Sequence, residues 1–148
     1  MMDFNLENVV NHRIGMIALL MKRQVIKLIS DHNLDITPEQ WIVLFYLWQE
    51  DGLSIGEIAS RSKKDFANVT RIVDKLKKME YVNKIKSKKD GRIFHVFIQP
   101  KADKIKNDIH NCWKQASDIA LNEISLSEQQ QLMEILAKIE NNILKDLE

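Results

Sequence analysis

The chain has few of the residues that build disulfide frameworks, linkers or membrane spans. Its 148 residues include one cysteine, Cys112, four glycines and two prolines. A single cysteine excludes an intramolecular disulfide framework and fits a reducing compartment. No apolar run approaches the roughly 18 residues that a membrane span needs. The first residues, MMDFNLENVVNH, lack the basic and then apolar pattern of a secretory signal. We therefore expect a cytoplasmic protein without membrane contact.

Net charge is also nearly absent, but the charge is unevenly placed. The whole chain carries a formal charge of +1, whereas residues 61–92 hold 12 Lys or Arg against 4 Asp or Glu. The remainder of the chain is therefore acidic. An isolated lysine-rich run is most often a solvated face, but a basic patch on a neutral chain can also serve as the one surface that meets a polyanion.

Apolar residues at three- and four-residue spacing predict six helices. Capping boxes, in which a Ser or Thr is followed three residues later by Glu or Gln, indicate three of the starts: Thr37 with Gln40, Ser54 with Glu57, and Ser127 with Gln130. Residues 61–64 are expected to form the turn between the third and fourth helices. The expected helical ranges are about 6–31, 37–52, 54–60, 65–79, 101–122 and 127–147.

The fourth of these helices separates apolar from hydrogen-bonding residues. The apolar side is expected to hold Phe66, Val69, Ile72, Val73 and Leu76. The opposite side and its flanks carry Asn68, Thr70, Arg71 and Lys75. Amide, hydroxyl and cationic side chains of this kind bind base edges and phosphates.

A hairpin is predicted after this helix. Over 93–98, the set Phe94, Val96 and Ile98 alternates with the set Ile93, His95 and Phe97, a period-2 pattern that predicts a strand, and 82–86 is a weaker partner strand. Between them lies the turn Asp90-Gly91, where glycine suits a tight turn. It is surrounded by Lys86, Lys88, Lys89 and Arg92. Basic side chains on an exposed loop tip stabilise a fold little and indicate a polyanionic partner.

Helix, turn, helix and hairpin in this order predict a mainly α (α+β) fold, a winged helix-turn-helix with flanking dimerisation helices. We expect a single domain over 1–148, with a DNA-binding lobe at about 37–100. The long apolar stripes of the helices at about 6–31 and 101–147 need a partner surface, and a second copy of the chain is the simplest one.

The sequence resembles the MarR family of bacterial transcriptional regulators over nearly its whole length. The most specific match is residues 69–76, VTRIVDKL, which follow the family's recognition-helix pattern. Asp90 and Arg92 match its Asp-x-Arg signature in the wing, and residues 37–41 and 54–59 match more loosely. The chain departs from the pattern at Glu80 and at Lys101–Asp103, where the family often has glycine, and at Gly91, where it usually has arginine.

The resemblance implies a homodimer in which the first, fifth and sixth helices intertwine above two DNA-binding lobes. Asn68, Thr70, Arg71 and Lys75 would then face the major groove, and Arg92, held by Asp90, would enter the minor groove. Phosphate contacts would come from Lys63, Lys64, Lys75, Lys86, Lys88 and Lys89. We expect a regulator, most often a repressor in this family, on a pseudo-palindromic operator with half-sites about 34–36 Å apart.

A small aromatic effector is a further expectation from the resemblance. Its pocket would involve His12, Met16, Trp41 and Phe45. The spacing of the two aromatic residues is also that of ordinary core residues, so packing is the competing interpretation.

Other functions have weaker support in the sequence. The four histidines are scattered without ligand spacing, so no metal or other cofactor is expected. The sequence contains no phosphate-binding glycine loop and no nucleophile motif, so it gives no sign of an enzyme. Two alternatives stay open: a winged helix used only for protein contacts, and a redox-sensing regulator acting through Cys112. A cysteine in an apolar stripe is more often a buried, inert thiol.

Overall fold

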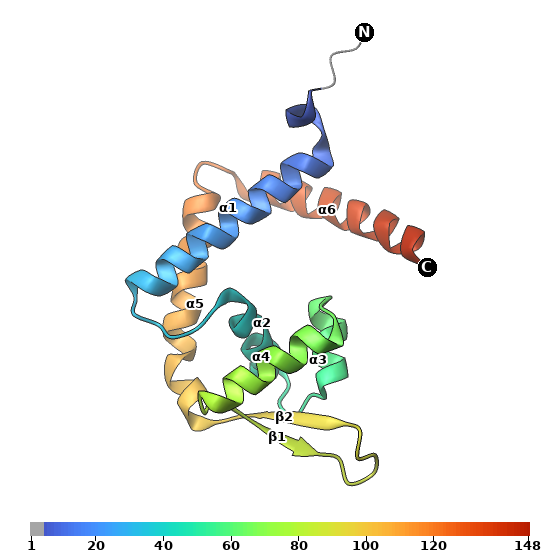
Figure 1. Ribbon diagram of the computed structural model, residues 1–148. Helices are drawn as coiled ribbons and strands as arrows, with labels where there is room; N and C mark the ends of the chain where they lie inside the picture. The colour runs from blue at the N-terminus through green and yellow to red at the C-terminus, as the bar shows by residue number, and fades with distance from the viewer. Residues whose placement is uncertain (1–4) are drawn as a thin grey trace. The chain divides into compact units, whose positions relative to one another are not determined.

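The computed structural model describes residues 5–148 (Figure 1). The elements in chain order are η1 (Leu6–Asn8), α1 (Val10–Asp31), α2 (Pro38–Gln49), α3 (Ile55–Ser62), α4 (Phe66–Lys78), β1 (Val82–Lys86), β2 (Phe94–Ile98), α5 (Pro100–Ala120) and α6 (Leu126–Leu147). The predicted mainly helical winged helix-turn-helix is confirmed. No helix in the described range is long and apolar enough to cross a membrane.

The chain divides into two compact units between Ala116 and Ser117. The first contains α1 to α4, the hairpin and most of α5. The second contains the last residues of α5 and the whole of α6. Every residue of α6 is at least partly exposed. The expected organisation as a single domain stays a prediction.

The helix-turn-helix is held by the apolar sides of α2, α3 and α4. Its fully buried side chains are Val43, Leu44, Leu47, Ile58, Val69, Val73 and Leu76. Each buried side chain of this size contributes roughly 1.5–3 kcal/mol through removal of apolar surface from water. This shared core fixes the angle at which α4 presents its other face to solvent.

The wing is attached to this core through its second strand. β1 pairs with β2 in antiparallel register from Val82 opposite Ile98 to Lys86 opposite Phe94. On the other side of β2, the Val96 amide donates to the Leu53 carbonyl over 2.8 Å, just before α3. Val96 itself is fully buried. The hairpin is therefore joined to the helix-turn-helix by backbone hydrogen bonding at Val96.

The boundaries of the first and third helices differ from the predictions. The first helix does not begin at Leu6: a short 3₁₀ turn comes first, and extended backbone at Val9 (φ −85°, ψ 118°) separates it from α1. The expected turn at 61–64 is shorter, because α3 continues through Ser62. The reversal is made at Lys63, whose φ of 53° lies in the left-handed region.

The predicted capping box at Ser127 is wrong. α6 begins two residues earlier, with Ser125 as its N-cap and Glu128 as the partner residue. The Glu128 carboxylate accepts from the Ser125 amide over 2.8 Å. A charged carboxylate accepts a stronger hydrogen bond than the neutral amide of Gln130 would, which explains why the earlier start is preferred.

Phe66 is also not where the helical pattern placed it. It was expected on the buried side of the recognition helix, yet 57% of its surface is exposed. Phe66 is the first residue of α4. Helical side chains lean toward the N-terminus, so a residue in the first position points past the end of the helix and away from the core below it.

Glu80 occupies a backbone conformation that suits glycine. Its φ is 63°, and it ends α4 in a Schellman motif: the Tyr81 amide donates to the Leu76 carbonyl (2.9 Å) and the Glu80 amide to the Lys77 carbonyl (3.0 Å). Left-handed backbone is costly for residues with a Cβ. The glycine usual in the family at this position thus has a physical reason.

We predict that Glu80→Gly stabilises the protein by about 0.5–1 kcal/mol, because the strain at this position is removed. Urea unfolding followed by circular dichroism measures the change. Lys77→Gly, three residues earlier within α4, is the control and should destabilise by up to about 1 kcal/mol. Equal destabilisation by both variants would contradict the strain argument.

Candidate nucleic-acid interface

The solvent face of α4 carries the side chains predicted to contact bases. Arg71 and Lys75 are exposed, and Asn68 and Thr70 are half-buried beside them. The Thr70 hydroxyl donates to the Phe66 carbonyl over 2.9 Å, which fixes its rotamer and leaves its lone pairs as acceptors. The helix thus presents a cation, an amide and an acceptor on one surface, a set that can distinguish base edges.

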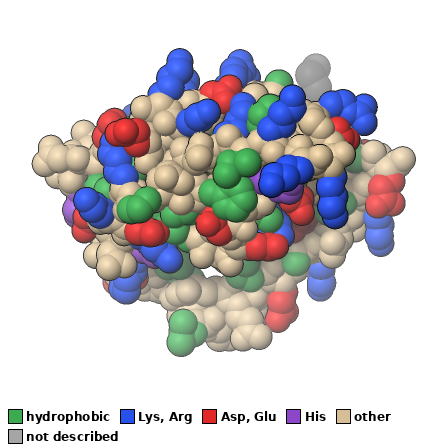
Figure 2. Space-filling view, turned by 90° about the horizontal axis from the view of Figure 1, so that it is seen from below, with side chains coloured by type: hydrophobic (Ala, Val, Ile, Leu, Met, Phe, Trp, Pro, Cys, Tyr) green, Lys and Arg blue, Asp and Glu red, His purple; other side chains and the backbone are tan. Residues whose placement is uncertain are grey.

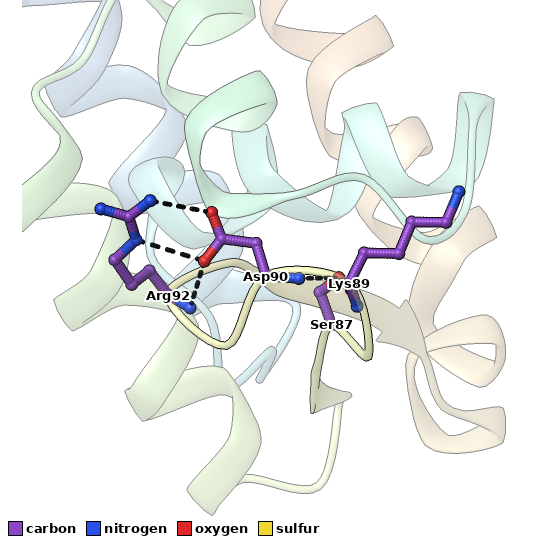
Figure 3. A network of polar contacts seen from close by, with 4 residues as sticks. All are labelled: Ser87, Lys89, Asp90 and Arg92. Carbon is purple, nitrogen blue, oxygen red and sulfur yellow. Dashed lines mark hydrogen bonds and ion pairs between the residues drawn. The ribbon is translucent and has the colours of Figure 1, made fainter.

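The wing tip holds its arginine in a defined direction (Figure 3). Both Asp90 oxygens accept from the Arg92 guanidinium, each over 3.2 Å, and the Arg92 amide donates to Oδ1 over 3.0 Å. The guanidinium and the amide of Arg92 hold the pKa of the Asp90 carboxyl below its ordinary value. The Arg92 side chain is nevertheless 92% exposed, so it is oriented and still free to bind.

The Ser87 hydroxyl organises the turn before this pair. It accepts from the amides of Lys89 (3.2 Å) and Asp90 (3.4 Å), and the Lys89 side chain extends away from the Asp90–Arg92 pair (Figure 3). Sequence reasoning did not single out Ser87. A serine one position after a strand and before a turn is the signal that could have indicated it.

Gly91 does not act in the turn as expected. Among the described residues, Gly52 is the one glycine with a positive φ, so Gly91 is not needed for left-handed backbone. A Cβ at Gly91 would lie 3.0 Å from Cε of Lys86. The absence of a side chain there lets Lys86 lie close along the tip. Lys86, Lys88 and Lys89 are all exposed.

Lys84 connects the wing to the recognition helix, and the sequence pattern did not indicate it. Its ammonium, in β1, lies 2.8 Å from Oδ1 of Asp74 in α4 and 4.8 Å above the ring of Phe94 in β2. The Lys84 side chain is largely buried, at 18% exposure, so the ion pair is better shielded than a surface pair. Alternate residues of a strand lie on the same face, and this alternation places Lys84 on the inner side of the hairpin. That placement is the sequence signal that could have indicated Lys84.

Lys63 and Lys64 lie between α3 and α4. Lys63 is exposed at the reversal of the chain, and Lys64 is half-buried. Figure 2 shows the molecule from the side on which β1 and β2 lie in Figure 1, and Lys and Arg side chains are spread over this face with Asp, Glu and hydrophobic side chains between them. The face thus combines positive charge with acidic and apolar side chains.

The four residues expected at an effector pocket fall into two groups. His12 and Met16 line an open hollow of about 310 Å³ along α1, together with Glu7, Arg13, Ile17 and Leu20. Trp41 and Phe45 do not line it. They belong to an aromatic cluster in which Trp41 stacks on Trp113 of α5 at 4.0 Å between ring centroids and lies 5.2 Å from Phe45.

Three buried ring nitrogens near this cluster have no hydrogen-bond partner among the described residues. They are Nε1 of Trp41, Nε1 of Trp113 and Nε2 of His110. Buried polar atoms are normally paired, and each orphaned donor or acceptor costs about 1–3 kcal/mol. Neither Trp113 nor His110 was indicated by the helical pattern, which treats both as ordinary positions of α5.

Cys112 is fully buried in the first unit, and its Sγ lies 3.9 Å from the Leu28 carbonyl oxygen. Burial, with a smaller effect of Asp108, raises the pKa of the Cys112 thiol. A raised pKa lowers the thiolate fraction, and the thiolate is the reactive form. The geometry therefore favours the inert thiol over the redox alternative. In residues 5–148, no three His, Cys, Asp or Glu side chains are grouped so that they could hold a metal ion.

Comparison with known proteins agrees with this architecture. Residues 36–94 match the model of the MarR family. Among solved structures, a MarR protein from Peptoclostridium difficile has a TM-score of 0.85 at 20% identity, covering 99% of this chain and 93% of the other. PcaV of Streptomyces coelicolor, in complex with its natural ligand, has a TM-score of 0.83 at 16% identity, covering 95% and 98%. These likenesses establish the fold.

Curated relatives extend the match beyond residues 36–94. The HTH-type transcriptional regulator TtmR of Methylorubrum extorquens is 28% identical over 78% of this chain, and YybA of Bacillus subtilis is 23% identical over 95% of it. The chain spans 57% of the length of TtmR and 93% of that of YybA. The helix order, the anchored Asp90–Arg92 pair, the family model and these relatives agree, and residues 36–94 form a MarR-family domain.

Proposed function

We propose that this chain is a homodimeric transcription regulator that binds a pseudo-palindromic operator in double-stranded DNA. In this proposal Asn68, Thr70, Arg71 and Lys75 of α4 lie in the major groove, and Arg92 lies in the minor groove. The surrounding lysines, Lys63, Lys64, Lys86, Lys88 and Lys89, contact phosphates. Repression is the expected mode of action, by steric exclusion at a promoter.

The proposal rests on two exposed arginines that lie on the same unit and could each contact DNA. Arg71 is exposed on a helix anchored by a buried core, and Arg92 is exposed on a wing whose carboxylate partner fixes its direction. Lys84 ties the two elements together through Asp74. A guanidinium held in this way suits the narrow, electronegative minor groove of A·T-rich DNA.

Dimerisation is proposed from the apolar residues that α1 and α6 expose. On α1, Ile17, Leu20 and Met21 are 45–57% exposed, and on α6, Leu132, Ile135 and Ile143 are 44–54% exposed. Repeated large apolar side chains along two long helices exceed what a monomer normally leaves in water. A second copy would cover them and would place two lobes on one face of the duplex, about one helical turn apart.

The test is fluorescence anisotropy of the full chain with the DNA upstream of its own gene. We expect tighter binding to this DNA than to random duplex, a steep fall in affinity with salt, and a loss of about one unit of salt slope in Arg92→Ala. The absence of binding to any duplex at low salt would contradict the proposal. It would favour the alternative of a winged helix that binds proteins.

A small aromatic acid is proposed as the effector that releases DNA. PcaV is known with its natural ligand, and DNA binding by BpsR of Bordetella bronchiseptica is regulated by 6-hydroxynicotinic acid; BpsR has a TM-score of 0.84 at 17% identity, covering 93% of this chain and 96% of that one. In this chain, the hollow at His12 and Met16 also holds Arg13, whose charge suits a carboxylate. Trp41 offers an unpaired ring N–H.

We predict that an acid that accepts a hydrogen bond from the unpaired Nε1 of Trp41 quenches tryptophan fluorescence, because Trp41 is one of the fluorophores and stacks on a second, Trp113. The same acid should lower the affinity for the upstream DNA at the concentrations that quench. Titration of a panel of benzoic, hydroxybenzoic and nicotinic acids measures both effects. Binding without any change in DNA affinity would contradict the release mechanism.

A further inference from the structure

A hollow of about 200 Å³ lies between the wing and the helix-turn-helix. Its lining comes from three elements: Ile55 and Gly56 at the start of α3, Phe66 at the start of α4, and Arg92, Ile93 and Phe94 in the wing. We call it the wing hollow. All of these residues belong to the first unit.

The wing hollow is apolar although its surroundings are basic. Phe66 is 57% exposed and Ile93 is 41% exposed, so two large hydrophobic side chains face water at this point. Residues 61–92, which include Phe66, carry three times as many basic as acidic residues. A basic surface with an apolar centre is suited to a polyanion that also has apolar faces.

The position of the wing hollow identifies which part of such a polyanion would occupy it. Under the proposed function, α4 enters the major groove and Arg92 enters the minor groove. Phe66 is the first residue of that helix, and Arg92 is the wing residue that is proposed to enter the minor groove. The sugar-phosphate backbone is what separates the two grooves of a duplex. The strand between the grooves must therefore cross the wing hollow.

We propose that Phe66 and Ile93 pack against the deoxyribose rings of this strand. This inference rests on the proposed function. The C–H faces of the sugars match the apolar lining, while the phosphates on either side meet the lysines around it. Such a contact adds affinity without reading sequence, because every nucleotide carries the same sugar. It also explains why a helix start that faces solvent carries phenylalanine.

The test compares Phe66→Ala with Arg92→Ala in anisotropy titrations across a salt series. Two duplexes are used: the DNA upstream of the gene and a random sequence. We expect Phe66→Ala to weaken binding to both duplexes by about fivefold, the effect of removing roughly half a phenylalanine from apolar contact. Its salt slope should equal that of the unmodified chain, because no phosphate contact is lost, whereas Arg92→Ala should reduce the slope.

Two further variants serve as controls for the contact at Phe66. Ile85→Ala removes an apolar side chain of similar exposure (50%) from β1, outside the wing hollow, and should leave affinity unchanged. Phe66→Leu keeps an apolar side chain and should retain most of the affinity. Unchanged urea midpoints for these variants show that folding is intact, as expected for a residue that is more than half exposed.

Three outcomes would overturn the inference. If Phe66→Ala binds both duplexes like the unmodified chain while Arg92→Ala binds them more weakly, DNA does not occupy the wing hollow. If the effect of Phe66→Ala disappears when thymines of the upstream duplex are replaced by uracil, the partner is a thymine methyl group and not a sugar. If the unmodified chain binds neither duplex, the proposed function itself fails, and the inference falls with it.

Discussion

Ile135→Glu combined with Ile143→Glu is expected to convert the protein to monomers and to weaken operator binding by roughly 10²–10⁴-fold. Both side chains are more than half exposed on α6, so their replacement disturbs little packing within the second unit. Buried in a dimer interface, the two carboxylates would be desolvated without partners, which is strongly unfavourable. The lost affinity follows because the second lobe no longer binds at the high effective concentration set by the first.

Sedimentation velocity measures the association, and anisotropy with the upstream DNA measures the binding. Gln130→Glu combined with Asn141→Glu is the matched control, since it adds the same charge to exposed positions on the opposite side of α6. It should leave the dimer intact. A dimer that survives the two isoleucine substitutions would show that α6 does not form the interface.

Arg71→Ala is expected to weaken binding to the cognate operator by about 1–3 kcal/mol, or roughly 5- to 150-fold, and to relax base preference at one position of each half-site. Arg71 is exposed on α4, and its helical turn is held in place by the buried Val69 and Val73. A guanidinium at this position can donate two parallel hydrogen bonds to guanine, which alanine cannot replace.

Competition with duplexes that carry single base changes distinguishes a base contact from a phosphate contact. A base contact gives Arg71→Ala a loss that depends on the base at one position. An equal loss on every duplex, with a reduced salt slope, would show that Arg71 binds only phosphate. Lys138→Ala in α6 removes an exposed positive charge outside the DNA-binding lobe, and it should change neither quantity.

Local chemistry made most elements predictable. The capping boxes at Thr37 and Ser54 lie where the helices begin, and β1 has the predicted bounds, because both depend on residues a few positions apart. The same local rule failed at Ser127. Two overlapping boxes compete there, and the stronger acceptor, Glu128, decides the start of α6.

Exposure at a helix end was not predictable from periodicity. The pattern assigns Phe66 to the apolar side of α4, but it takes no account of the helix end, and a side chain in the first position points past that end. Lys84 was missed for a similar reason. Its partners, Asp74 and the ring of Phe94, come from two other elements, and only their packing brings them within reach.

The sequence by itself determined the order of the elements, the apolar core of the helix-turn-helix, and the set of basic side chains on α4 and the wing. These follow from spacing along the chain, which sets the face of a helix or strand on which each residue lies. Only the tertiary structure decided which of those side chains are held and which are free. Asp74 holds Lys84, burial raises the pKa of Cys112, and Phe66 and Ile93 line one hollow, because each of these depends on distances across elements that spacing does not specify.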